Sequence, residues 1–150
     1  MANSYISCYL HVVFSTKNRR PLIDSDLQKR LWPYLGGIAR ENGIKALSIG
    51  GISDHVHLLL SLPSTITIAK SVQLIKGGSS KWIHETFPVK KDFAWQEGYG
   101  AFSINISIIE ETIKYIERQE EHHRKRSFKE EYFDFLKKHG IEYDERYVLG

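Results

Sequence analysis

The sequence contains almost no cysteine and no long hydrophobic run. Its single cysteine, Cys8, lies in an alternating apolar segment, which indicates a buried thiol and excludes an internal disulfide framework. The N-terminus has no basic region followed by an apolar stretch and a small-residue cleavage site. No later apolar segment approaches the length of a membrane span. We therefore expect a soluble, cytoplasmic protein that is not exported and has no membrane partner.

The chain also has little net charge, and its basic residues occur in short clusters. With 150 residues, 41% of them hydrophobic, it is long enough for one core, so we predict a single domain over 1–150. A formal net charge of +3 is a weak argument for a nucleic-acid partner, although local clusters can bind phosphates. The clusters are Lys17, Arg19 and Arg20, then Lys90 and Lys91, then Arg124, Lys125 and Arg126.

The apolar periodicity predicts an α+β fold. Strands are expected over 6–14, 44–49, 55–62 and 93–106, and helices over about 25–42 and 66–87. Two more helices are expected after Ser107 and after Ser127, each opening with a capping-box pattern. This order predicts a ferredoxin-like split βαβ sandwich: a four-stranded antiparallel sheet with helices on one face, plus added C-terminal helices.

Paired glycines give two more local expectations. We expect Gly50 and Gly51 to turn the chain between the second and third strands. Gly77 and Gly78 are expected to weaken or bend the second long helix.

Two histidines on the third strand are the first candidates for chemistry. In His55-Val56-His57, alternation along the strand directs both imidazoles to the same face of the sheet, so both can bind one cation. Such a pair leaves coordination positions open for a substrate oxygen. An isolated His-x-His is at least as often a pair of strand histidines without a ligand, so the neighbouring elements must decide.

A tyrosine and a glutamine on the following helix supply that context. Tyr115 and Gln119 are four residues apart and share one helix face beside the buried isoleucines. The Tyr115 phenolate is suited to attack a phosphodiester, and the Gln119 amide oxygen to bind a metal that polarises the same phosphate. The common alternative is that both are ordinary surface residues of an amphipathic helix.

Other tyrosines and histidines are weaker candidates. Tyr99 lies between glycines and is typical of a turn, while Tyr5 and Tyr9 are typical of packing or base stacking. His122 and His123 point about 100° apart on a helix and cannot easily share one ion. We expect His84 to be a surface residue, and His11 to lie near the site without an assigned role.

Four sequence blocks together resemble the single-tyrosine HUH transposases of the insertion-sequence 200/605 family, including the repeat-associated tyrosine transposases. The blocks occur in family order over about residues 5–120. They are Tyr9-Leu10-His11-Val12-Val13-Phe14-Ser15-Thr16-Lys17 followed by Arg20-Pro21, Asp54-His55-Val56-His57-Leu58-Leu59, Trp95-Gln96-Glu97-Gly98-Tyr99 and Tyr115-Ile116-Glu117-Arg118-Gln119.

This resemblance implies a DNA transposase that cleaves and rejoins single-stranded DNA through a 5′-phosphotyrosine intermediate. It places the nucleophile at Tyr115 and a Mg²⁺ or Mn²⁺ ion on His55, His57 and Gln119. The expected substrate is single-stranded DNA with hairpin-containing element ends. Candidate DNA-binding residues are Lys17, Arg19, Arg20, Lys76 and Lys81.

The resemblance also implies a homodimer. We expect its active sites to be shared, with the histidines of one chain facing Tyr115 of the other, and the first strand to be the edge that pairs. Two alternatives remain at this point: a related nickase or replication-initiation nuclease, and a non-catalytic ferredoxin-like nucleic-acid-binding module.

Overall fold

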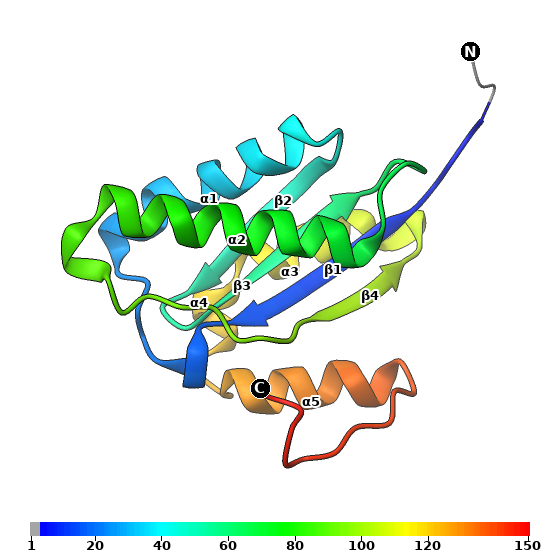
Figure 1. The fold of residues 1–150 in the computed structure, drawn as a ribbon. Coiled ribbons are helices and arrows are strands. Elements are labelled where there is room, and N and C mark those ends of the chain that lie inside the picture. The colour runs from blue at the N-terminus through cyan, green and yellow to red at the C-terminus, as the bar shows by residue number, and fades with distance from the viewer. Residues whose placement is uncertain (1–3) are drawn as a thin grey trace.

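The computed structural model describes residues 4–150 and consists of a four-stranded antiparallel sheet between helices (Figure 1). The strands are β1 (Tyr9–Ser15), β2 (Lys45–Ile52), β3 (His55–Ser61) and β4 (Gly100–Ile104), in the order β2-β3-β1-β4. The helices are α1 (Ser25–Glu41), α2 (Ile68–Thr86), α3 (Ile109–Glu117), α4 (Gln119–His122) and α5 (Phe128–Lys138). Short 3-10 turns cover Lys17–Arg19, Pro88–Lys90 and Ile106–Ile108.

The predicted α+β class and antiparallel sheet are confirmed, but the prediction for the edge strand is wrong. β1 lies in the interior of the sheet, paired with β3 on one side and β4 on the other. β2 and β4 are the edges. Alternation alone marks a strand as half-buried and does not reveal how many neighbours it has.

Helices α1 and α2 cover one face of the sheet (Figure 1). Asp24 caps α1 as expected, accepting a 2.8 Å hydrogen bond from the Leu27 backbone amide. The core between these helices and the sheet consists of the inward-facing side chains of β1 and β3 and the apolar side chains of α1 and α2 that face them. Its largest fully buried members include Phe14, Leu27, Leu31, Leu35, Leu58, Leu60 and Ile75.

The opposite face carries α3, α4 and α5. α3 and α4 pack on β2, and α5 packs on β1 and β4 through a second apolar cluster. That cluster consists of Val13, Phe102, Phe128, Tyr132 and Leu136. The predicted caps of α5 are confirmed, because Ser127 accepts from the Glu130 amide at 3.2 Å and Gly140 follows the helix with φ +65°.

Four local expectations are wrong. Gly50 and Gly51 lie within β2, and the turn falls at residues 53–54. α2 runs without interruption through its paired glycines. Residues 93–99 form no regular strand, apart from one bridge between Trp95 and Thr16. Ser107 does not cap α3; the Asn105 side chain caps the 3-10 turn that precedes it.

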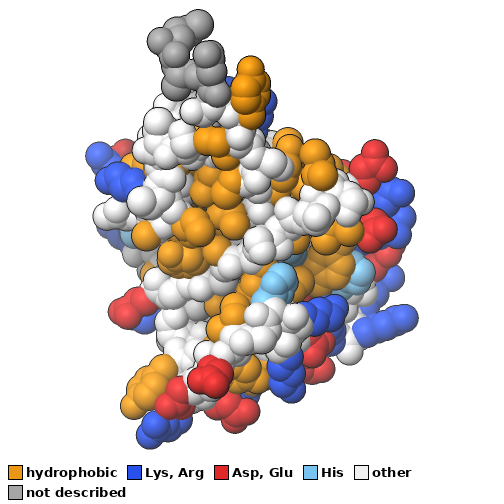
Figure 2. Space-filling model, turned by 90° about the vertical axis from the view of Figure 1, so that its right-hand side faces the viewer, with side chains coloured by type: hydrophobic (Ala, Val, Ile, Leu, Met, Phe, Trp, Pro, Cys, Tyr) orange, Lys and Arg blue, Asp and Glu red, His pale blue; other side chains and the backbone are white. Residues whose placement is uncertain are grey.

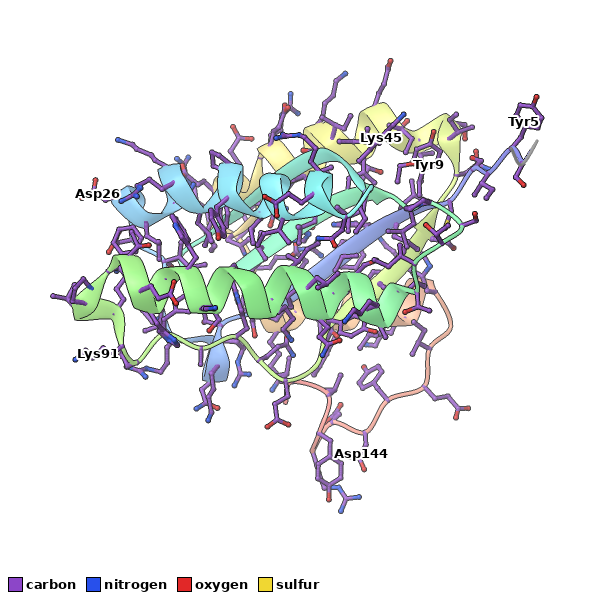
Figure 3. All side chains as sticks on the ribbon, turned by 45° about the horizontal axis from the view of Figure 1, so that its top comes forward. Tyr5, Tyr9, Asp26, Lys45, Lys91 and Asp144 are labelled. Atoms are coloured by element: carbon purple, nitrogen blue, oxygen red, sulfur yellow. The ribbon has the colours of Figure 1, made fainter. Side chains whose placement is uncertain are left out.

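The end of the sheet where β1 begins and β4 ends is partly apolar at its surface. Figure 2 looks at this end and shows hydrophobic side chains over its middle, with charged side chains around the margin. Exposed hydrophobic residues on the segments that meet here include Ile6, Ile68, Ile106 and Ile108. Tyr5 projects from the N-terminal segment with 95% of its surface exposed (Figure 3). Among residues 4–150, no helix is long and apolar enough to cross a membrane.

Candidate active site

The two strand histidines lie on the sheet face that α3, α4 and α5 cover. His55 and His57 are fully buried, and their ring centroids are 5.0 Å apart. In the pairing of β3 with β1, His55 lies opposite Ser15 and His57 lies opposite Val13. The two histidines therefore lie at the end of the sheet where β1 ends. The expected common face is therefore observed.

Each of these histidines is oriented by a second polar group. His55 Nδ1 lies 2.8 Å from Asp54 Oδ1, and His57 Nδ1 lies 2.7 Å from His11 Nε2. A carboxylate can only accept, so His55 carries its proton on Nδ1. In both rings this arrangement directs Nε2 toward the helices. Outer partners of this kind orient imidazoles that ligate a metal.

The glutamine reaches the cluster although it does not share a helix with the tyrosine. α3 ends at Glu117, and Gln119 begins the separate short helix α4. Gln119 is 1% exposed, and its amide nitrogen donates to the Tyr115 carbonyl at 3.2 Å, which fixes the orientation of the amide. Its Oε1 then lies 3.0 Å from His55 Nε2. When the His55 proton is on Nδ1, both His55 Nε2 and Gln119 Oε1 are acceptors, and their lone pairs point at each other. A cation bound between the two atoms would stabilise this arrangement.

Two further donors come from residues that the sequence reading did not select. His123 Nε2 lies 3.1 Å from Gln119 Oε1 and 3.2 Å from Glu131 Oε1. Glu131 Oε1 also lies 3.0 Å from His57 Nε2 and 3.6 Å from His55 Nε2. The candidate ligand atoms of the three histidines and Glu131 all lie within 4.8 Å of one another.

These separations fit a divalent cation. Bonds of about 2.1 Å at right angles separate neighbouring donor atoms by about 3 Å. Imidazole nitrogens with carboxylate and amide oxygens form a donor set that suits divalent ions of the first transition series.

The candidate nucleophile touches the same carboxylate. Tyr115 donates its hydroxyl proton to Glu131 Oε2, while Glu131 Oε1 faces the histidines. Arg126 donates to the Tyr115 hydroxyl at 3.1 Å and also pairs with Asp134. The ring centroids of Tyr115 and His57 are 5.8 Å apart. One chain therefore brings the tyrosine and both strand histidines together.

Burial and charge set the protonation of these groups. Burial lowers the pKa of His57 to about 4, against the opposing effect of Glu131, so its ring is neutral near pH 7. Burial acting alone would raise the pKa of Glu131, but hydrogen bonds from His123 and His57 outweigh it and hold that pKa far below the usual range. Burial and the adjacent Glu131 carboxylate raise the pKa of Tyr115 well above its ordinary value. The hydroxyl therefore stays protonated until positive charge approaches.

The predicted DNA-binding residues lie in two places. The segment directly after β1 contains Lys17, Arg19 and Arg20. Its first residue, Thr16, donates its backbone amide to the Asp54 carbonyl, so this segment lies beside the turn that precedes His55. Lys76 and Lys81 lie on α2, over the other face of the sheet. The Lys76 ammonium donates to the carbonyls of residues 96, 97 and 98, so it shapes that loop.

Comparison with known proteins decides the family. Residues 4–119 match the family described as transposase IS200 like. The chain belongs to the IS200-like transposase family. The members of this family are DNA strand-transfer enzymes, so the chain is a transposase by family and its function class is DNA transposition.

Individual relatives agree with this assignment. The chain is 27% identical over 114 residues to the ISDra2 transposase TnpA of Deinococcus radiodurans, covering 73% of this chain and 81% of that protein. It is 25% identical over 87 residues to the transposase for insertion sequence element IS200 of Salmonella typhimurium, covering 58% of this chain and 57% of that protein.

Two solved structures share the fold. A transposase structure from Deinococcus radiodurans has a TM-score of 0.63 at 24% identity, covering 79% of this chain and 96% of that one. A REP-associated tyrosine transposase bound to a REP hairpin has a TM-score of 0.57 at 16% identity, covering 77% of this chain and 68% of that one.

Proposed function

We propose that this transposase cleaves and rejoins single-stranded DNA through a covalent bond between Tyr115 and a DNA 5′-phosphate. The observation that carries the proposal is the position of Glu131, whose two carboxylate oxygens contact the Tyr115 hydroxyl and the histidine cluster. The nucleophile and the donor set therefore meet at a single side chain.

The residues present fit a divalent metal held by His55, His57 and Gln119, with His123 and Glu131 as further donors. When bound, such an ion would act as a Lewis acid on the scissile phosphate and offset the negative charge of the Glu131 carboxylate. The proposed ion is Mg²⁺ or Mn²⁺, and the histidine-rich donor set favours Mn²⁺.

The chain's own groups account for the proton and the phenolate. Tyr115 gives up its proton along the existing hydrogen bond to Glu131, and Arg126 stabilises the developing phenolate. The phenolate oxygen bonds to phosphorus as the bond from phosphorus to the 3′-oxygen breaks, and that oxygen takes up the proton that Tyr115 released to Glu131. The phosphotyrosine bond preserves the energy of the broken phosphodiester, so a 3′-hydroxyl can reverse the attack without ATP.

The test is formation of a denaturation-resistant adduct with labelled, hairpin-containing single strands from the DNA flanking the gene. Tyr115→Phe should abolish the adduct while the chain still folds, with a loss of about 1.5–3 kcal/mol of stability because the buried Glu131 carboxylate loses one donor. Tyr99→Phe is the matched control and should retain the adduct. Excess chelator should abolish the adduct, and Mn²⁺ or Mg²⁺ should restore it. An undiminished adduct in Tyr115→Phe would contradict the assignment of the nucleophile.

We also propose a homodimer, and the edge strand β4 is a candidate for its interface. β2 is the other edge, and helices pack on one face of each edge strand, so the segment after β4 is what distinguishes the two edges. The segment that follows β4 carries two exposed isoleucines, Ile106 and Ile108. An unpaired edge beside apolar side chains is suited to pairing with a second copy.

The sequence predicted active sites that are shared between chains, and mixing two inactive variants distinguishes that arrangement from a site within one chain. Each chain already places Tyr115 beside its own His57, so the arrangement favours a site within one chain. A His57→Ala chain mixed with a Tyr115→Phe chain should then form no adduct once subunit exchange has been demonstrated. Adduct formation by the mixture would establish shared sites.

A further inference from the structure

The segment from α4 to the start of α5 borders a hollow beside the candidate nucleophile. The hollow has a volume of about 600 Å³ and is lined by Tyr115, Glu121, His122, Arg124, Lys125 and Arg126. Three of these six side chains are cationic and one is anionic, so the hollow carries a positive balance. Tyr115 and Arg126 also line a second hollow of about 310 Å³ on the α5 side, so the tyrosine stands between the two.

The cations at the mouth of the hollow have no acidic partner. Arg124 and Lys125 are exposed, and within residues 4–150 neither forms an ion pair with a carboxylate. Arg126, deeper in the wall, is paired with Asp134 and bonded to the Tyr115 hydroxyl. The two outer side chains therefore remain available to an anion.

The wall of the hollow also contains an unsatisfied polar atom. The His122 ring stacks on the Tyr115 ring, with centroids 4.3 Å apart and planes inclined by 24°. His122 Nε2 is shielded from solvent and has no hydrogen-bond partner among the described residues. A buried polar atom without a partner is unfavourable, so a ligand that supplies an acceptor oxygen is favoured here.

We propose that this hollow binds a backbone phosphate of single-stranded DNA next to the phosphate that Tyr115 attacks. Arg124 and Lys125 would contact its oxygens, and a small rotation of the His122 ring would let Nε2 donate to one of them. This inference rests on the proposed function, because it takes single-stranded DNA as the substrate. It adds a substrate-positioning site to the catalytic groups and assigns a role to a basic segment outside the matched family region, 4–119.

A matched pair of cations exists at the opposite end of the sheet. Arg40 and Lys45 are exposed and line a hollow of about 460 Å³. Lys45 pairs with Ser61, six residues along β3 from His55, which corresponds to about 20 Å. Figure 3 shows Lys45 toward the end of the molecule that carries Tyr9. Removing both charges there changes the net charge equally without touching the proposed site.

The experiment measures the affinity of the full chain for a fluorescein-labelled, mixed-sequence single strand of about 20 nucleotides by fluorescence anisotropy. Chelator is present so that no cleavage occurs, and salt is varied. The Arg124→Gln/Lys125→Gln variant should raise Kd by about tenfold or more at 0.1 M salt. It should also reduce the slope of log K against log salt by about 0.7, since each phosphate that is no longer neutralised on a single strand contributes about 0.7.

The Arg40→Gln/Lys45→Gln control should keep Kd within about twofold and leave the slope unchanged. His122→Phe keeps the stacked ring and removes Nε2, so it should raise Kd several-fold with little change in slope. It should also fold normally, because it removes an unsatisfied atom.

If the two double variants lose the same affinity for the strand, the loss reflects only the change in net charge, and the proposal is overturned. Unchanged binding in the Arg124→Gln/Lys125→Gln variant would overturn it as well, and unchanged binding in His122→Phe would remove that residue from the site. Failure of the proposed function can be distinguished from failure of this inference. If the wild-type chain binds the strand through this hollow but forms no adduct, the nuclease function is refuted. If the chain forms the adduct and Arg124→Gln/Lys125→Gln does not change binding, the phosphate site is refuted.

Discussion

Substitution of Gly50 should displace the nucleophile without altering any catalytic side chain. A Cβ atom at Gly50 would lie 2.5 Å from the Ile116 carbonyl oxygen and 3.0 Å from Ile116 Cγ2. Restoring an ordinary contact requires α3 to move away from β2 by about 1 Å. Tyr115 is the neighbour of Ile116 on that helix, so Gly50→Ala should move its hydroxyl relative to the histidines.

Two magnitudes follow from that displacement. Overpacking of this kind costs about 1–3 kcal/mol, which for a chain of this length lowers Tm by roughly 2–12 °C. A catalytic group misplaced by about 1 Å can lose about 100-fold in rate. The Gly50→Ala variant should therefore still fold, while its rate of adduct formation falls by one to two orders of magnitude.

The assay combines thermal unfolding by circular dichroism with the rate of covalent adduct formation. Gly37→Ala in α1 is the matched control, because a Cβ there meets nothing within 4 Å. It should leave the rate unchanged and stabilise the chain by about 0.5–1 kcal/mol through helix propensity. A Gly50→Ala variant with wild-type Tm and wild-type rate would refute the close packing of α3 on β2.

Two further predictions concern the metal-free protein in chelator. Glu131→Gln should destabilise the chain by about 2–3 kcal/mol in urea unfolding, because it removes a buried charged acceptor, whereas the exposed Glu130→Gln should change stability by less than about 0.5 kcal/mol. Because the pKa of folded His57 is about 4, below its unfolded value, the unfolded chain takes up this proton first on acidification. His57 should therefore contribute a loss of stability of up to roughly 3 kcal/mol between pH 6.5 and 4, and His57→Asn should flatten that part of the profile.

The site residues that the sequence predicted are those whose positions follow from local periodicity. Alternation along β3 was enough to place His55 and His57 on one face, and both are buried there. Tyr115 and Gln119 reach the same cluster by another route, because the helix breaks at Arg118 and the glutamine begins a new turn. Helical spacing alone cannot reveal that break.

Glu131 was missed because its sequence context is that of an ordinary acidic residue in the first turn of a helix, where carboxylates favour the helix dipole. A signal for it does exist. Glu131 lies three residues after Phe128 and four before Phe135, on the apolar stripe of α5, where a charged residue is rarely buried without partners. Its partners come from β3, α3 and the segment after α4, which only tertiary packing brings together.

Glycine in β2 was misread for a related reason. A glycine pair is typical of a turn, but Gly50 is required by the close approach of another backbone. Likewise, Phe93 to Tyr99 has the composition of a strand, yet three of its carbonyls bind the Lys76 ammonium instead of a neighbouring strand. Patterns within one segment cannot show such contacts, because the partner is distant in sequence.

The division of the site between two parts of the chain has an energetic consequence. The matched family region, 4–119, supplies the strand histidines, Tyr115 and Gln119. The residues after it supply His123, Arg126 and Glu131, each of which contacts one of the former. Burying a carboxylate is unfavourable unless it is fully hydrogen-bonded, so the docking of α5 depends on the histidines and the tyrosine as well as on its own apolar face. The docking of α5 and the position of Tyr115 are therefore thermodynamically linked. A substitution that weakens the contacts of Glu131 with the histidines or with Tyr115 also destabilises the docked helix.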